Sequence, residues 1–264
     1  MTSSRSSPEN HGNYPNHSPN TRSAAIAPHF LCPKTEGLYV SIYYQDEHVT
    51  LYHGDCLEHT AWLEADVLVT DPPYGIGWKQ PDLPASMGSG RAKHGSFHKH
   101  VGILNDDNTE ARDKVLHAWG EDKPAIVFAG WQKPITRNVR QTLIWKKPSN
   151  IGVIGAKYGY RRDTEAIYLL GRHQQRTVAR SSVLETSGSN TNYQDGTHPH
   201  MKPISLMEQL MEWTDGVIAD PFAGSGSTLV AARNLGRRAI GVELEEKYCE
   251  IIANRLSQGA FDFA

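Results

Sequence analysis

The chain has 264 residues, of which 38% are hydrophobic and 21% charged, and its formal net charge at pH 7 is -2. These values are typical of a globular α/β protein, and no apolar run is long enough to cross a bilayer. A net charge of -2 exerts no overall pull on nucleic acid, so a polyanionic partner would need a local basic patch. Cysteines 32, 56 and 249 lie far apart without CxxC spacing, which argues against a disulfide framework and a cysteine zinc site and favours the cytoplasm.

In chain order, residues 1–37 come first and are rich in Ser, Asn, Pro and His without apolar periodicity, which predicts a disordered N-terminal arm. Residues 38–264 are predicted to form a single domain, which begins with a β-hairpin in "LYVSIYYQDEHVTLYHGD". Further strands are predicted at Val67–Thr70, Ala125–Ala129, Thr142–Trp145, Glu165–Leu170, Val217–Ala219 and Arg238–Val242. Helices are predicted in "KPISLMEQLMEW", "STLVAARNLG" and "EEKYCEIIANRL". Strands that alternate with helices indicate an α/β fold, a Rossmann-like and mostly parallel sheet with helices on both faces.

The stretch "VLVTDPPYGIGW" places an acid, two prolines and a tyrosine directly after a buried strand. Residues at this point of an open α/β sheet face the ligand crevice. Pro72 and Pro73 restrict the backbone and remove two N–H donors. The Asp71 carboxylate and the Pro72 carbonyl can each accept a hydrogen bond from one amino group, and Tyr74 can stack on a flat ring. A rigid proline turn with a solvent-facing acid is the alternative interpretation.

A second motif, "GVIADPFAGSGSTLVAARNLGRRAIGVELEEKY", predicts a strand that ends at Asp220, a glycine turn and a helix that begins near Ser227 or Thr228. Gly224 and Gly226 allow a ligand to approach the backbone closely, and the N–H groups at the helix start favour an anionic group. The next strand ends at Glu243, close to where an acid binds ribose hydroxyls in nucleotide-binding folds. Neither the dinucleotide fingerprint nor a GK[ST] phosphate loop is present, so the predicted ligand has a ribose but no pyrophosphate. A turn chosen only for its geometry is the alternative.

"DPPY" followed downstream by "DPFAGSGST" resembles the amino-group DNA methyltransferases, and this order of motifs resembles their β class. "HGDCL", "IWKKPSN" and "HPHMKP" extend the resemblance over most of the chain. It implies the S-adenosylmethionine-dependent methyltransferase fold with permuted motif order, S-adenosylmethionine as cofactor and double-stranded DNA as substrate. By position, the resemblance implies catalytic roles for Asp71, Pro72, Pro73 and Tyr74. It implies cofactor binding by Asp55, Lys202, Asp220, Phe222, Gly224, Gly226, Ser227, Thr228 and Glu243. "HPHMKP" departs from the family pattern at His200 and Met201, which weakens the assignment of Lys202.

The acid at position 71 favours adenine N6 as the methylated atom, because the cytosine-N4 members usually have serine there. Cytosine N4, or a protein or small-molecule substrate, are the alternatives. A base inside a duplex cannot reach such a pocket, so the resemblance implies that the base is flipped out. Tyr74 is the first candidate for stacking on that base and Trp78 is the second.

Two basic segments, within possible DNA-contact insertions at residues 79–108 and 171–197, are candidates for binding the DNA backbone. The first contains Arg91, Lys93 and Lys99, and the second contains Arg172, Arg176 and Arg180. The latter three would share one face if the segment were helical. A solvated surface is the alternative. Zinc binding by His94, His98 and His100 is disfavoured because no cysteine or fourth ligand is evident, so no metal site is predicted. A recognition region this short suggests that a second subunit contributes, as a homodimer, to reading a short motif.

Overall fold

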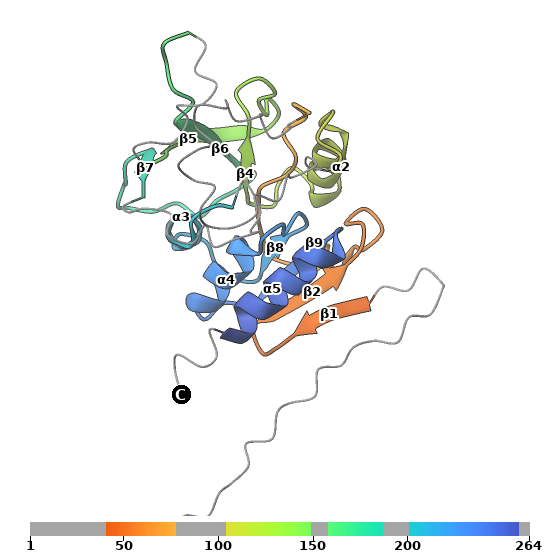
Figure 1. The fold of residues 1–264 in the computed structure, drawn as a ribbon. Coiled ribbons are helices and arrows are strands. Elements are labelled where there is room, and N and C mark those ends of the chain that lie inside the picture. Colours follow the sequence, from red (N-terminus) through yellow and green to blue (C-terminus); the bar gives the residue numbers. More distant parts are fainter. Residues whose placement is uncertain (1–40, 78–103, 149–157, 187–200, 259–264) are drawn as a thin grey trace, which may run out of the picture. The chain divides into compact units, whose positions relative to one another are not determined.

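The computed structural model describes residues 41–77, 104–148, 158–186 and 201–258 (Figure 1). These residues all belong to one compact unit. The arm at residues 1–37 lies outside the described ranges, and so do Trp78, the three histidines considered for zinc, and Arg91, Lys93 and Lys99. None of the helices in the described ranges combines the length and apolar character that crossing a bilayer requires.

The described strands form one sheet in the order β1-β2-β9-β8-β3-β4-β6-β5-β7. Their bounds are β1 Ser41–Gln45, β2 Val49–His53, β3 Val67–Thr70, β4 Ala125–Ala129, β5 Val139–Lys146, β6 Thr164–Leu170, β7 Val183–Glu185, β8 Ile218–Asp220 and β9 Ala239–Glu243. Strands β2, β9, β8, β3 and β4 run parallel to one another, whereas β1 pairs antiparallel with β2, and β6 pairs antiparallel with both β4 and β5. The predicted N-terminal hairpin, the six further strands and the mostly parallel sheet are confirmed.

Helices cover both faces of the sheet, as the sequence predicted. The described helices are the 3-10 helix η1 Ala61–Glu64 and the α-helices α2 Glu110–Trp119, α3 Ile204–Met211, α4 Ser227–Asn234 and α5 Glu246–Gln258. The three predicted helices correspond to α3, α4 and α5. Helix α2 and strand β7 were not predicted, because α2 buries few side chains and β7 has only three residues.

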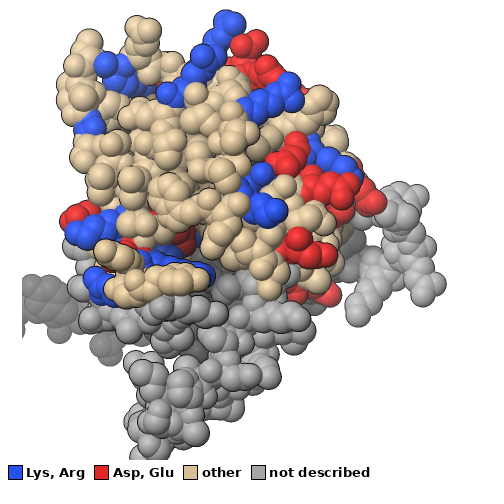
Figure 2. All heavy atoms as spheres, turned by 90° about the horizontal axis from the view of Figure 1, so that it is seen from above, with Lys and Arg blue, Asp and Glu red and all other residues tan. Residues whose placement is uncertain are grey.

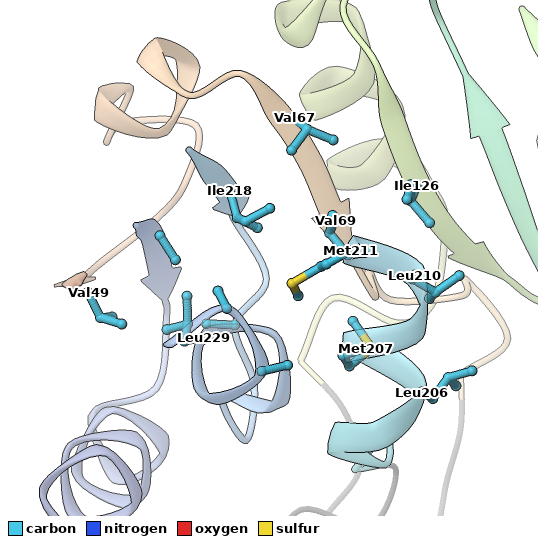
Figure 3. Close-up of a cluster of buried hydrophobic side chains, with 14 of the residues drawn as sticks. Val49, Val67, Val69, Ile126, Leu206, Met207, Leu210, Met211, Ile218 and Leu229 are labelled. Atoms are coloured by element: carbon cyan, nitrogen blue, oxygen red, sulfur yellow. The ribbon is translucent and has the colours of Figure 1, made fainter. Parts of the chain in front are cut away.

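The side chains of β3 alternate between two hydrophobic clusters. Val67 and Val69 pack in the cluster that contains α3, α4 and α5. Figure 3 shows the α3 side chains, among them Met211, in that cluster. Leu68 points the other way and packs in the cluster that contains Trp62 of η1 and side chains of α2. A central strand buried on both faces explains why "VLVT" is a continuous apolar run without alternation.

The chain turns in opposite directions from two neighbouring strands, β3 and β8. From β3 it continues to β4 on one side, and from β8 it continues to β9 on the other. In open α/β sheets a ligand binds outside the carboxyl ends of the strands at such a switch point. At these ends the Thr70 hydroxyl donates to Asp220 Oδ1 over 2.7 Å, so the ends of both predicted motifs are in direct contact.

Candidate active site and cofactor pocket

A cavity of about 910 Å³ opens at this switch point and contains most residues of both predicted motifs. Its lining includes the catalytic candidates Asp71, Pro72, Pro73 and Tyr74 and the cofactor candidates Asp55, Lys202, Asp220, Phe222, Gly224, Ser227, Thr228 and Glu243. Gly226 does not line the cavity. The fold therefore brings together two motifs that are about 150 residues apart in the sequence, since Thr70 and Asp220 are separated by 150 positions.

Asp71 lies at the end of β3 and is held from both sides. Lys202 Nζ lies 2.5 Å from Asp71 Oδ2, and the lysine side chain is only 6% exposed. The Tyr74 hydroxyl lies 2.9 Å from Asp71 Oδ1 and 3.2 Å from Glu165 Oε2, and its single proton can be donated to one of them at a time. The solvent-facing acid of the alternative interpretation does not fit this geometry. Each Asp71 oxygen retains a lone pair for a hydrogen bond from a ligand in the cavity.

Glu165 and Lys147 complete the ionic network around Asp71, and neither was a candidate from the sequence. Glu165 Oε1 lies 2.6 Å from Lys147 Nζ, and Glu165 Oε2 lies 3.3 Å from Lys202 Nζ. Two carboxylates and two ammonium groups share the site, so its formal charge is balanced. A buried charge requires such pairing because desolvation otherwise disfavours the ionised form.

The pKa values in this network follow burial and pairing. Burial raises the pKa of Asp71, and Lys202 opposes that rise. Burial also disfavours the ionised form of Glu165, but Lys202 and then Lys147 outweigh it and hold the Glu165 pKa at about 2. The pKa of Lys202 is raised, because the attraction of Asp71 and Glu165 exceeds the effect of burial. Lys202, which was expected to bind the cofactor, pairs directly with Asp71 and lines the same cavity, so cofactor binding by Lys202 stays a prediction.

The second half of the cavity is the glycine turn between β8 and α4. Asp220 Oδ1 accepts the Thr70 hydroxyl and the Phe222 N–H, so its carboxylate fixes the start of the turn. Burial raises the Asp220 pKa to about 6, against hydrogen bonds from Thr228 and Thr70. The helix begins at Ser227, as predicted.

Backbone conformation and packing, rather than approach of a ligand, explain the glycine at position 226. Its φ is +79°, and a Cβ added there would lie 2.8 Å from Cγ1 of Ile252 in α5. Arg255, one turn further along α5, donates to the Ser225 carbonyl oxygen. The glycine is therefore needed for a left-handed backbone conformation and for helix packing, rather than for approach of a ligand to this residue.

Glu243, which ends β9, and Asp55, which follows β2, line the cavity beside the glycine turn. Glu243 Oε2 accepts the Gly224 N–H over 2.7 Å, and the Gly54 N–H donates to the Glu243 carbonyl oxygen over 2.9 Å. Burial raises the Glu243 pKa to about 7. Asp55 closes its own turn by accepting the Leu57 N–H at Oδ1.

These residues fit an adenosine-containing ligand. Two carboxylates at the ends of neighbouring strands offer acceptors for ribose hydroxyls and for an amino group. Burial disfavours the ionised form of Glu243 despite its hydrogen bonds from the Gly224 and Glu245 N–H groups, and further hydroxyl donors would stabilise that form.

Arg172, Arg176 and Arg180 do not share a helix face, which their four-residue spacing would have given only in a helical segment. Residues 171–182 form no helix, and Gly171 turns the chain with a φ of +73°. Arg172 pairs with Asp122 in the connection from α2 to β4, and Arg176 and Arg180 pair with Asp215 and Glu212 in the connection from α3 to β8. Figure 2 shows one face of the molecule on which Lys and Arg are interspersed with Asp and Glu. DNA contact by these arginines stays a prediction.

Comparison with known proteins decides the family. The family model described as DNA methylase, that of the N6 and N4 methyltransferases, matches residues 65–254. The chain belongs to this family. The matched range contains β3, β8, β9 and the whole ionic network around Asp71.

This DNA methylase has relatives that cover most of its length. The type II methyltransferase M.ScaI of Streptomyces caespitosus is 25% identical to it over 257 residues, which are 83% of this chain and 84% of M.ScaI. Two solved structures share its fold. The M1.HpyAVI–SAM complex has a TM-score of 0.56 at 20% identity and covers 79% of this chain and 98% of its own. The cytosine-N4-specific PvuII DNA methyltransferase has a TM-score of 0.57 at 16% identity and covers 82% of this chain and 89% of its own.

Glu165, Lys147 and Trp131 line the cavity of the DNA methylase and were not candidates from the sequence. One signal could have found them. Trp131 follows the end of β4, and Lys147 and Glu165 lie at adjacent ends of β5 and β6, so all three are close to strand termini. The antiparallel course of β6 was not predicted, and without it Glu165 cannot be placed at the same sheet edge as Asp71.

Proposed function

We propose that this DNA methylase transfers a methyl group to the N6 amine of an adenine in DNA. The observation that carries the proposal is the partly buried Asp71 carboxylate, which pairs with Lys202 in a cavity that it shares with the glycine turn. The preference for adenine rests on the acid at position 71, where the family's cytosine-N4 members usually have serine.

The turn of residues 71–74, which we call the elbow, can activate an exocyclic amine by hydrogen bonding. The nitrogen lone pair of such an amine is delocalised into the ring, so the amine is a poor nucleophile. Asp71 and the Pro72 carbonyl can accept its two N–H bonds, which favours a pyramidal nitrogen with a localised lone pair. The Asp71 carboxylate can also accept the proton that the amine releases. Acceptors that are fixed before the substrate arrives stabilise the transition state without a reorganisation cost.

S-adenosylmethionine is the cofactor, and it supplies the methyl group from its sulfonium centre. We assign Glu243 to the ribose hydroxyls, Asp55 to the adenine amino group, and Phe222, Gly224 and the start of α4 to the methionine moiety. Asp220 acts through the turn, since its carboxylate is occupied by Thr70 and Phe222.

The target base has to leave the duplex to enter the cavity, which costs a few kcal/mol. Tyr74 is fixed by its hydroxyl, with Gly130 beside its ring, and the ring lines the cavity. A stack of the flipped base on an aromatic ring is worth about 1–3 kcal/mol and offsets part of that cost.

Incubation with labelled S-adenosylmethionine and duplex DNA, followed by nucleoside analysis, tests the proposal. We expect the label in N6-methyladenine and none in an Asp71→Ala variant that still binds the cofactor. Label in N4-methylcytosine would retain the methylase and refute the choice of base. Label that requires protein or a small molecule in place of DNA would refute the proposed substrate.

A further inference from the structure

A group of aromatic and basic side chains lies at the mouth of the cavity, outside the motifs described so far. It consists of Trp131, which follows β4, and of Tyr160, Arg161 and Arg162, which precede β6; we call it the rim. Trp131, Arg161 and Arg162 line the same cavity as Asp71 and Tyr74. Trp131 is 50% exposed and Tyr160 is 86% exposed, although large aromatic side chains are usually buried.

The rim is attached to the strand ends that hold the catalytic network. The Trp131 indole N–H donates to the Thr164 carbonyl oxygen over 3.3 Å, and Thr164 directly precedes Glu165. The Lys147 N–H donates to the Asp163 carbonyl oxygen over 2.7 Å, which ties the segment to the end of β5. The indole is therefore oriented before any ligand arrives, and less side-chain entropy is lost on binding.

The charges of the rim suit a phosphate backbone. Arg161 shares its charge with Asp163 at 3.3 Å, whereas Arg162 has no ion-pair partner among the residues that the structure describes. The arginines at 172, 176 and 180 all pair with acids and do not line the cavity. Among the described residues that line the cavity, Arg162 is thus an arginine whose charge is not paired with an acid and can bind an external anion.

We propose that the rim binds the DNA strand beside the base held at Asp71. Trp131 stacks on a base at the cavity mouth, and Arg162 binds a flanking phosphate. The combination of an exposed aromatic ring with a guanidinium is how proteins bind unstacked nucleotides with little sequence preference. This inference rests on the proposed function only in taking DNA as the substrate, and it holds whether the methylated base is adenine or cytosine.

The two residues are expected to leave different signatures in DNA binding. Trp131→Ala should weaken binding by about 5- to 150-fold, the range for loss of one base–aromatic stack, without changing the salt dependence. Trp131→Phe keeps a ring and should restore most of the affinity. Arg162→Ala should make the fall of log affinity with log salt less steep, by about 0.9 in slope, because one phosphate contact is lost.

The experiment measures fluorescence anisotropy of a labelled duplex oligonucleotide with the full chain and S-adenosylmethionine at several salt concentrations. The duplex carries a site that the wild type methylates, located by methylated-base sequencing. Arg137→Ala is the matched control, since Arg137 is also exposed, pairs with Glu121 and lies outside the cavity. Unchanged cofactor binding in each variant shows that the fold is intact.

The inference is overturned if Trp131→Ala binds DNA as the wild type does, or if Arg162→Ala has the same salt slope as Arg137→Ala. Should Trp131→Ala not fold, the Arg162→Ala slope and the affinity of Trp131→Phe decide. Failure of the proposed function looks different, because the wild type itself would then place no methyl group on adenine. If the wild type methylates cytosine instead, the duplex that carries that site tests the rim in the same way.

Discussion

Replacing Lys202 with methionine tests the ionic network around Asp71. Methionine keeps most of the side-chain volume and removes the ammonium group that lies 2.5 Å from Asp71 and 3.3 Å from Glu165. The site then holds two carboxylates against Lys147 alone. Breaking a buried pair by removing one partner costs about 3–5 kcal/mol, because a buried charge remains uncompensated.

The pH dependence gives this prediction its sign. Lys202 lowers the Asp71 pKa against the effect of burial, so its removal raises that pKa further. A raised folded-state pKa contributes stability that is present below the unfolded pKa and is lost as pH rises through the folded pKa. The destabilisation of Lys202→Met should therefore grow with pH. Methyl transfer should change in the opposite direction and recover as pH rises, because it needs the Asp71 carboxylate ionised to accept the amine hydrogen bond.

Urea denaturation and single-turnover methylation, each across a range of pH, measure the two trends. Lys146→Met is the matched control, since Lys146 is adjacent to Lys147 and forms an exposed ion pair with Glu185. An exposed pair contributes about 0.2–1 kcal/mol, so the control should stay close to the wild type. A Lys202→Met variant with the wild-type pH profile and a loss of stability below about 1 kcal/mol would refute the network as the device that keeps Asp71 ionised.

Four further predictions follow from the cavity and its supports. Asp71→Ala should abolish methyl transfer and leave the cofactor dissociation constant, measured by equilibrium dialysis, within a few-fold of the wild type. Normal turnover by this variant would contradict the role of Asp71. Gly226→Val should destabilise the fold by about 2–5 kcal/mol, from its left-handed backbone and the clash with Ile252, and a wild-type unfolding midpoint would show the clash to be relieved. Ribose hydroxyl donors should bind the ionised form of Glu243, whose pKa is about 7, so cofactor affinity should fall about tenfold per pH unit as Glu243 becomes protonated below pH 7. Calorimetry of Glu243→Gln should show a weaker affinity without this pH dependence. Light scattering should show a homodimer, and a monomer with sharp site selectivity would contradict the contribution of a second subunit to DNA recognition.

Local sequence patterns determined the sheet and the turns. The run "VLVT", the hairpin around "QDEH" and the periodicity of α4 and α5 each reflect short-range requirements, namely burial of a strand on both faces, a turn, or one apolar helix face. Because strands and turns depend on such short-range patterns, the sequence also places "DPPY" and the glycine turn at strand ends. No local pattern showed whether residues 171–182 would be helical; they form no helix, and their arginines pair with acids that are distant in the sequence.

By itself the sequence determined that this protein has a mostly parallel α/β sheet with an acceptor-rich elbow and a nucleoside-type turn. Only the tertiary structure decided that these motifs share one cavity, that Lys202 pairs with Asp71 and that Glu165 and Lys147 balance the charge. Lys202 and Asp71 are 131 positions apart in the sequence. The contacts of Glu165 depend on β6 running antiparallel between β4 and β5. A buried charge is stabilised by whatever lies within a few ångströms of it, and that distance is set by packing of the whole sheet rather than by neighbours in the chain.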